Sequence, residues 1–92
     1  MTPFSYVVIF QGVTVPEFIS SVDKLPDVIN WYSILPQTVF MVSNLNASQL
    51  TRLIRTNIQG ITRLLVLDAN TDRNGWLPEK AWDFLRKPGP PK

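Results

Sequence analysis

The stretch Phe4–Gln11, FSYVVIFQ, decides the fold of this 92-residue chain. Its alternate residues form two faces, and both are largely apolar and rich in β-branched and aromatic side chains, which is typical of a central strand. After this strand, Thr14 and Glu17 have the three-residue spacing of a helix capping box. Apolar residues then continue at helical spacing until Pro26 ends the pattern. The chain therefore begins with a strand followed by a helix.

The remaining segments follow in an order that indicates the fold class. We expect two strands joined at Pro36-Gln37, a helix capped at Asn46 and stopped by Gly60, a further strand, and a short final helix. The strands and the final helix are expected at Asn30–Leu35, Thr38–Ser43, Ile61–Leu67 and Glu79–Arg86. This order predicts an α+β, ferredoxin-like βαββαβ fold with a four-stranded antiparallel sheet, two helices on one face, and a short C-terminal helix. A different α+β order, in which Asn30–Leu35 is not a strand, is the alternative.

Length and composition limit the organisation and the chemistry of the chain. Ninety-two residues predict a single domain, residues 1–87, followed by a Pro/Gly-rich tail, residues 88–92. The chain has no cysteine and no histidine, which excludes disulfides, thiol nucleophiles and imidazole bases. Its amino-terminal end carries neither a targeting signal nor a membrane span, so we expect a cytoplasmic protein without a membrane partner.

One face of the predicted sheet cannot be covered by the two helices. Charged residues make up only 17% of the chain, against about 25% in typical domains, which suggests that another chain covers apolar surface. We therefore predict a homodimer or higher oligomer that buries this face. The expected contact residues are Tyr6, Val8, Phe10, Trp31 and Phe40. In the alternative, the C-terminal segment covers the face within one chain through Trp76, Trp82 and Phe84.

Positive charge is concentrated in the second half of the chain. Residues 1–46 carry a net charge of −2, whereas residues 47–92 carry +4. Arg52 and Arg55 lie three residues apart on the predicted second helix, away from its apolar stripe, and Arg63 and Arg73 add charge in the same half. These four arginines are the candidate nucleic-acid-binding residues, expected to contact phosphates without sequence preference. The competing interpretation is a solvated helix face, and a protein partner is the alternative ligand.

Three consecutive motifs carry a family resemblance. They are Asn30-Trp31-Tyr32-Ser33-Ile34-Leu35, Thr38-Val39-Phe40-Met41-Val42 and Asn44-Leu45-Asn46-Ala47-Ser48-Gln49-Leu50. This pattern resembles the small SinR-type proteins that group with the CRISPR-associated adaptation nucleases and the VapD proteins, and the resemblance covers about Phe4 to Leu85. It implies a ferredoxin-like subunit that dimerises through its sheet, with relatives that bind or cut nucleic acid.

One position departs from the pattern of the nuclease branch. In that branch the first strand ends in an acidic residue, paired across the dimer to hold a divalent metal, whereas here it ends in Gln11. A neutral amide is a poorer magnesium ligand than a carboxylate. We therefore predict a non-catalytic interaction module that binds nucleic acid in a defence or toxin–antitoxin context. The alternative is a metal-dependent endonuclease, acting on RNA or DNA, in which Asp68 or Asp72 replaces the missing acid.

The polar loop 68–75, DANTDRNG, is the remaining candidate for a metal site. Counted from Asp68, oxygen ligands fall at positions one, three and five of a calcium loop, but Arg73 stands where the sharp turn needs glycine. A second register, counted from Asn70, lacks the glutamate ligand at the last position. A turn that joins a strand to a helix explains the same composition. We therefore predict no metal site, no cofactor and no catalytic residue.

Overall fold

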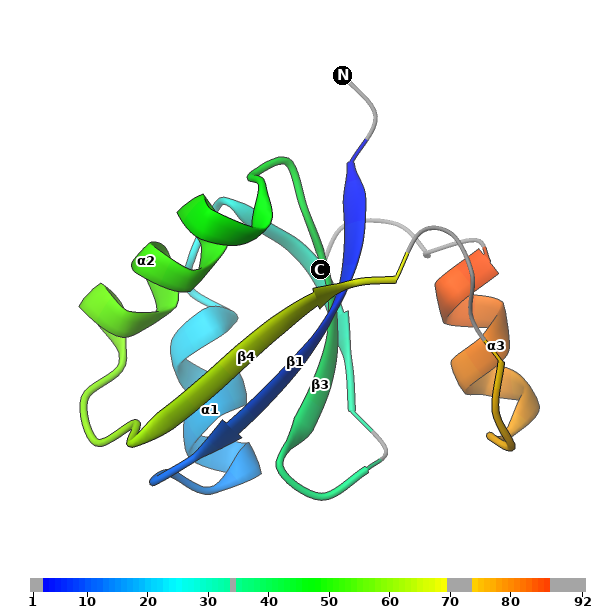
Figure 1. The fold of residues 1–92 in the computed structure, drawn as a ribbon, viewed down its shortest axis with the longest axis horizontal. Coiled ribbons are helices and arrows are strands. Elements are labelled where there is room, and N and C mark those ends of the chain that lie inside the picture. The colour runs from blue at the N-terminus through cyan, green and yellow to red at the C-terminus, as the bar shows by residue number, and fades with distance from the viewer. Residues whose placement is uncertain (1–2, 34, 70–73, 87–92) are drawn as a thin grey trace.

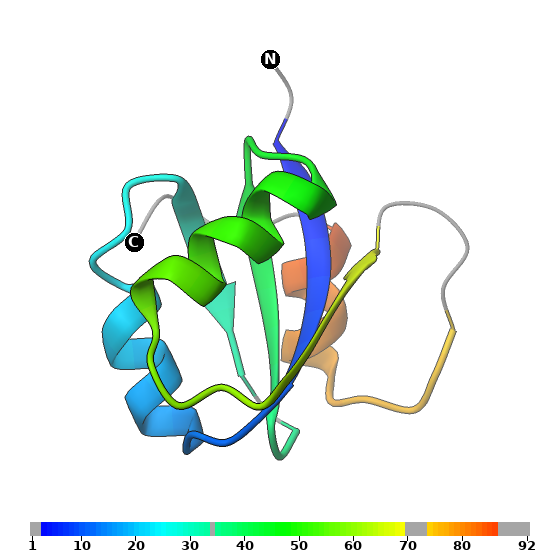
Figure 2. The same cartoon turned by 60° about the vertical axis from the view of Figure 1, so that its left-hand side comes forward.

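The computed structural model describes residues 3–33, 35–69 and 74–86. In chain order its elements are β1 (Phe4–Gln11), α1 (Val15–Val22), β2 (Val28–Tyr32), β3 (Thr38–Ser43), α2 (Ala47–Asn57), β4 (Arg63–Asp68) and α3 (Glu79–Arg86). The strands form one antiparallel sheet in the order β2-β3-β1-β4, so β1 is an inner strand and β4 is an edge strand. Helices α1 and α2 lie on one face of the sheet, and α3 lies on the other (Figures 1 and 2). The predicted α+β order, with its C-terminal helix and a ferredoxin-like layout, is confirmed.

Helices α1 and α2 both begin at reciprocal capping boxes. The Thr14 hydroxyl accepts the backbone N–H of Glu17 at 3.2 Å, and the Glu17 carboxylate accepts the backbone N–H of Thr14 at 3.0 Å. Asn46 and Gln49 form the same pair of bonds in α2, at 2.8 and 3.0 Å. These bonds satisfy amide groups that a helix start otherwise leaves without partners. The two helix starts are therefore determined by local sequence.

Strand β2 begins and ends earlier than predicted, at Val28–Tyr32 rather than Asn30–Leu35. Val28 is fully buried and pairs with Ser43 at the end of β3. A bulge lies between Val28 and Asn30 and shifts the register by one residue. The alternation of side chains breaks at a bulge, so the sequence pattern misplaced the strand.

Two glycines bring the turns that follow β1 and α2 into contact. Gly12 has φ +105°, and a Cβ atom on it would lie 2.0 Å from the carbonyl oxygen of Gly60, which itself has φ +96°. The Thr62 N–H donates to the Gln11 carbonyl at 2.9 Å, and β4 begins at Arg63 rather than at the predicted position 61. The close approach of the two turns therefore delays the start of β4 by two residues.

The main core lies between the sheet and the helices α1 and α2. Phe10 and Phe18 are fully buried and stack with their ring centroids 4.0 Å apart. Tyr6, Val8 and Phe10 belong to this core, and Trp31 packs against it while its Nε1–H donates to the Asp23 carboxylate at 3.0 Å. The prediction that these four residues line the uncovered face is therefore wrong. Both faces of β1 are apolar, so periodicity alone could not tell which face the helices cover.

Helix α3 covers part of the opposite face. Phe40, the one predicted contact residue on this face, is buried in a second cluster with Ala69, Ala81 and Leu85. The Tyr32 and Phe84 rings stack at 5.7 Å, and Trp82 packs against the same cluster. Trp76, by contrast, is 100% exposed. The alternative in which the C-terminal segment covers this face is therefore correct for Trp82 and Phe84 and wrong for Trp76.

An apolar strip beside α3 remains uncovered. It consists of Ile9 on β1 and Leu65 and Leu67 on β4, whose exposed fractions are 38%, 51% and 46%. Ile9 and Leu65 are direct cross-strand partners, so the strip is continuous across the two strands. Within the described ranges, no helix is long and apolar enough to cross a membrane. The predicted tail, residues 88–92, lies outside these ranges.

Candidate nucleic-acid interface

Helix α2 places Arg52 and Arg55 on its outer side. Leu50 and Ile54 are fully buried against the sheet. Arg52 is two residues from each of these buried side chains, which places it on the opposite side of the helix, and Arg55 follows three residues later beside it. Arg52 and Arg55 are accordingly exposed. The predicted position of the two arginines, away from the apolar stripe, is confirmed.

Two adjoining surface hollows connect this helix to the start of β4. The first, about 400 Å³, is lined by Ser48, Thr51, Arg52, Arg55 and Thr56. The second is lined by Thr51, Arg55, Ile61, Thr62, Arg63 and Leu64. Because Thr51 and Arg55 line both hollows, the two form one surface. We call this surface the arginine surface, and it brings together Arg52, Arg55 and Arg63.

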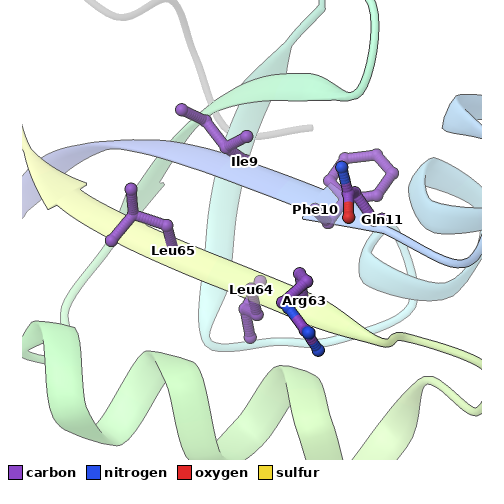
Figure 3. A pocket seen from close by; sticks show the side chains of 6 residues that line it. All are labelled: Ile9, Phe10, Gln11, Arg63, Leu64 and Leu65. Atoms are coloured by element: carbon purple, nitrogen blue, oxygen red, sulfur yellow. The ribbon is translucent and has the colours of Figure 1, made fainter.

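Arg63 joins the arginine surface from the first position of β4. It lies opposite Gln11 in the β1–β4 pair, and its Nη1 donates to the Thr62 carbonyl at 2.9 Å. In Figure 3 its guanidinium extends toward α2, and its side chain lines one hollow together with Ile9 and Leu65, on whose face of the sheet the strand register places it. The side chain therefore starts on the face of Leu65 and extends past the edge of the sheet to the hollow that Thr51 and Arg55 also line.

The arginine surface carries uncompensated positive charge. The sequence between Asp27 and Asp68 contains no acidic residue, and its basic residues are Arg52, Arg55 and Arg63. The ion pairs that form among the described residues both belong to Arg86 on α3, with Glu79 at 3.5 Å and Asp83 at 2.6 Å. An anion that approaches α2 thus meets three guanidinium groups and no competing carboxylate from this segment.

Sequence reasoning missed the hydroxyl groups that accompany the arginines. Ser48 and Thr51 each precede an arginine by four residues, which places each pair on one helix face. Thr56 also lines the first hollow, and Thr62 lines the second. Serine and threonine hydroxyls, with arginine, are frequent donors to phosphate oxygens. The sequence signal that could have identified Ser48 and Thr51 is the four-residue spacing from each hydroxyl residue to the arginine that follows it.

The other candidate residues lie away from the arginine surface or outside the described residues. Bases can stack on exposed aromatic rings, but Trp31 and Tyr32 pack against the two clusters of buried residues and Phe40 belongs to one of them, so these rings offer no free stacking platform. Arg73 and Asp72 lie outside the described residues, as do residues 70–73 of the loop tested for calcium. Within the described part of the chain, no three acidic side chains gather in a way that could hold a metal ion.

The titratable groups near the sheet have structural roles. The Tyr6 hydroxyl donates to the Leu45 carbonyl at 2.7 Å, and burial, with a smaller effect of the Asp68 charge, raises the pKa of this phenol. At the start of α1, the hydrogen bonds from Thr14 lower the pKa of Glu17. On α3, the hydrogen bond to Asp83 raises the pKa of Arg86. The first shift follows from burial and the other two from hydrogen bonds within a helix or its cap, and all three groups lie outside the arginine surface.

No protein-family model matches the chain, and the searches of curated proteins and of solved structures find no match either. The residues of this chain and their arrangement are therefore what indicates its function.

Proposed function

We propose that the protein is a non-catalytic module that binds nucleic acid through the arginine surface. The observation that carries the proposal is the grouping of Arg52, Arg55 and Arg63 around two adjoining hollows lined by hydroxyl groups. Phosphate oxygens accept charge-assisted hydrogen bonds from guanidinium groups, and each neutralised phosphate releases counterions. The chemistry of the surface matches a sugar-phosphate backbone.

The binding is expected to be independent of base sequence. Base readout needs amide or guanidinium donors that enter a groove, or aromatic rings on which bases stack. The arginine surface offers guanidinium and hydroxyl groups on a helix that lies flat against the sheet. The most exposed aromatic residue among those described, Trp76, lies before α3 and not on α2. Phosphate contacts position a nucleic acid without distinguishing its bases.

The test is a salt-dependent titration of labelled single-stranded and double-stranded RNA and DNA. We expect the double variant Arg52→Ala, Arg55→Ala to weaken binding to every sequence alike and to reduce the logarithmic salt slope by about one unit for each lost contact. The matched control is Lys24→Ala, Lys80→Ala, which removes the same charge from exposed positions outside the arginine surface. If the control variant weakened nucleic-acid binding as much as the arginine variant, the loss of binding would be explained by net charge alone. No binding by the parent protein would favour a protein partner.

A metal-dependent endonuclease is the second candidate function, and the sheet geometry makes it less favourable. The first strand ends in Gln11, directly opposite Arg63. A guanidinium at this position repels a divalent cation, and the amide supplies no negative charge to offset that repulsion. Incubation of labelled RNA and DNA with magnesium or manganese tests this candidate. Metal-dependent cleavage that Asp68→Asn abolishes would establish the nuclease.

The proposal also includes a homodimer in a defence or toxin–antitoxin setting. The dimer is supported by the apolar strip of Ile9, Leu65 and Leu67 that α3 leaves uncovered. The setting is supported by the resemblance to the SinR-type proteins. Light scattering at tens of micromolar tests the dimer, because a mass of 10.5 kDa would be that of one chain.

A further inference from the structure

We infer that a second copy of this chain pairs with the open edge of β4, extending the sheet through an antiparallel β4–β4 contact. The inference rests on the homodimer proposed above and specifies its interface. The predicted dimer contact between two sheet faces is thereby replaced with a contact between two strand edges. On one face Tyr6, Val8 and Phe10 are already buried beneath helices, and α3 occupies part of the opposite face. The edge of β4 is visible in front of the other strands in Figure 1.

The two edge strands of the sheet differ in how well they are protected from pairing. Natural proteins protect edges with bulges, short strands or charges within the strand. Strand β2 has five residues and a register shift between Val28 and Asn30. Strand β4 pairs with β1 in continuous register, and its charged residues are only its first and last, Arg63 and Asp68. Among the described residues, the interior of β4, Leu-Leu-Val-Leu, therefore carries none of these protections.

The register of the sheet shows which backbone groups of β4 point outward. The Ala69 N–H donates to the Ser5 carbonyl at 2.9 Å, so the odd-numbered residues of β4 direct their backbone groups toward β1. Phe10 donates its N–H to the Gln37 carbonyl on the opposite side of β1, which agrees with this alternation. Leu64 and Val66 consequently present their N–H and C=O groups to the open edge.

A second copy fits this edge because the strand is self-complementary about Val66. A two-fold axis at Val66 pairs Val66 with its own copy and makes Leu65 the direct partner of Leu67 of the second copy. Both leucines are about half exposed and lie on the same face of the sheet. The same symmetry brings the Arg63 end of one strand beside the Asp68 end of the other. Outward hydrogen-bonding groups, apolar side chains and charges are therefore matched in one register.

This arrangement also joins the two arginine surfaces. An antiparallel two-fold contact within a continuous sheet keeps α2 of both copies on the same face. The two pairs of Arg52 and Arg55 would then lie on one side of an eight-stranded sheet. A nucleic acid backbone that spans both pairs would bind more tightly than one that contacts a single pair.

The test uses exposed side chains on β4 and measures mass by sedimentation equilibrium, without nucleic acid. The parent protein is expected to be a dimer. The variant Leu65→Lys, Leu67→Lys is expected to be a folded monomer, with a dimer dissociation constant raised about 100-fold or more by lost leucine pairs and opposed like charges. The variant Leu65→Glu, Leu67→Glu should be a monomer too, and an equimolar mixture of the two variants should form a heterodimer. Circular dichroism checks that each variant is folded.

A matched control and a cross-linking experiment separate this interface from others. Ile9→Lys places the same charge on the same strip but one strand away from the edge, and it should leave the dimer intact. The chain has no cysteine, so oxidation of a mixture of Leu65→Cys and Leu67→Cys proteins should link the two chains. A monomeric parent protein, a dimer that only Ile9→Lys disrupts, or a mixture that does not cross-link would overturn the inference. Because these readouts need no nucleic acid, their failure is distinguishable from a failure to bind RNA or DNA.

Discussion

The face of the sheet beneath α1 and α2 and the face beneath α3 are built on the same four strands but are packed to different extents. The first holds a large cluster of buried residues, from Tyr6 on β1 to Ile58 after α2. The second holds four buried residues, and Leu65 and Leu67 remain about half exposed beside it. Burial of apolar side chains is the main source of folding stability. The first face therefore carries the stability of the fold, and the second leaves surface available for a partner.

The largest expected effect comes from the well-packed face. Phe10→Ala should lower the free energy of unfolding by about 3–5 kcal/mol, because the buried ring leaves a cavity and its stack with Phe18 is lost. Urea denaturation measures this change. The matched control is Phe4→Ala on the same strand, where the ring is 39% exposed and the loss should be about 1 kcal/mol or less. If the two variants lost the same free energy of unfolding, the burial of the Phe10 ring would not explain its contribution to stability.

A smaller and more local effect is expected on the second face. Phe84→Ala removes the ring that stacks on Tyr32. The loss should weaken the docking of α3 onto the sheet by about 1 kcal/mol. Hydrogen exchange should show faster exchange in α3, with the protection of β1 and β3 unchanged. Lys80→Ala, an exposed change on the same helix, serves as the control. If β1 and β3 lost protection together with α3, the two faces would form one cooperative unit and the comparison would fail.

The smallest effect concerns the charge at the start of α1. Hydrogen bonds from Thr14 hold the pKa of Glu17 below its ordinary value of 4.5. A lowered carboxyl pKa contributes stability above that ordinary value, and the contribution is lost as the pH falls through the lower folded value. Glu17→Gln should therefore flatten the stability profile in this acidic range while keeping the capping geometry.

Helix α2 provides the reciprocal variant for this test. Its capping box already has an uncharged residue, Gln49, at the corresponding position. Gln49→Glu should introduce the acid dependence that Glu17→Gln removes. Thermal unfolding between pH 3 and 7 compares the parent and both variants. If neither substitution changed the dependence of stability on pH in the acidic range, that dependence would come from other carboxylates.

Local signals in the sequence determined the elements and several of their boundaries. The ranges of β1, β3 and α3 agree with those predicted, and both capping boxes form as expected. Arg52 and Arg55 lie on the exposed side of α2, as helical spacing requires. These features depend on residues within a few positions of one another, so a linear pattern contains them. The bulge in β2 and the contact between Gly12 and Gly60 involve distant partners, and the pattern misplaced β2 and β4 accordingly.

Only the tertiary structure decided which face of the sheet the helices cover and which residues meet at the surface. Both faces of β1 are apolar, so the sequence allowed Tyr6, Val8 and Phe10 to be placed on the uncovered face, although they lie in the main core. Arg63 joined Arg52 and Arg55 only because β4 returns beside α2, which also placed the threonine hydroxyls between them. Periodicity specifies that a residue is apolar or charged and on which side of its own element it lies. Which other element packs against that side depends on contacts between segments far apart in the chain.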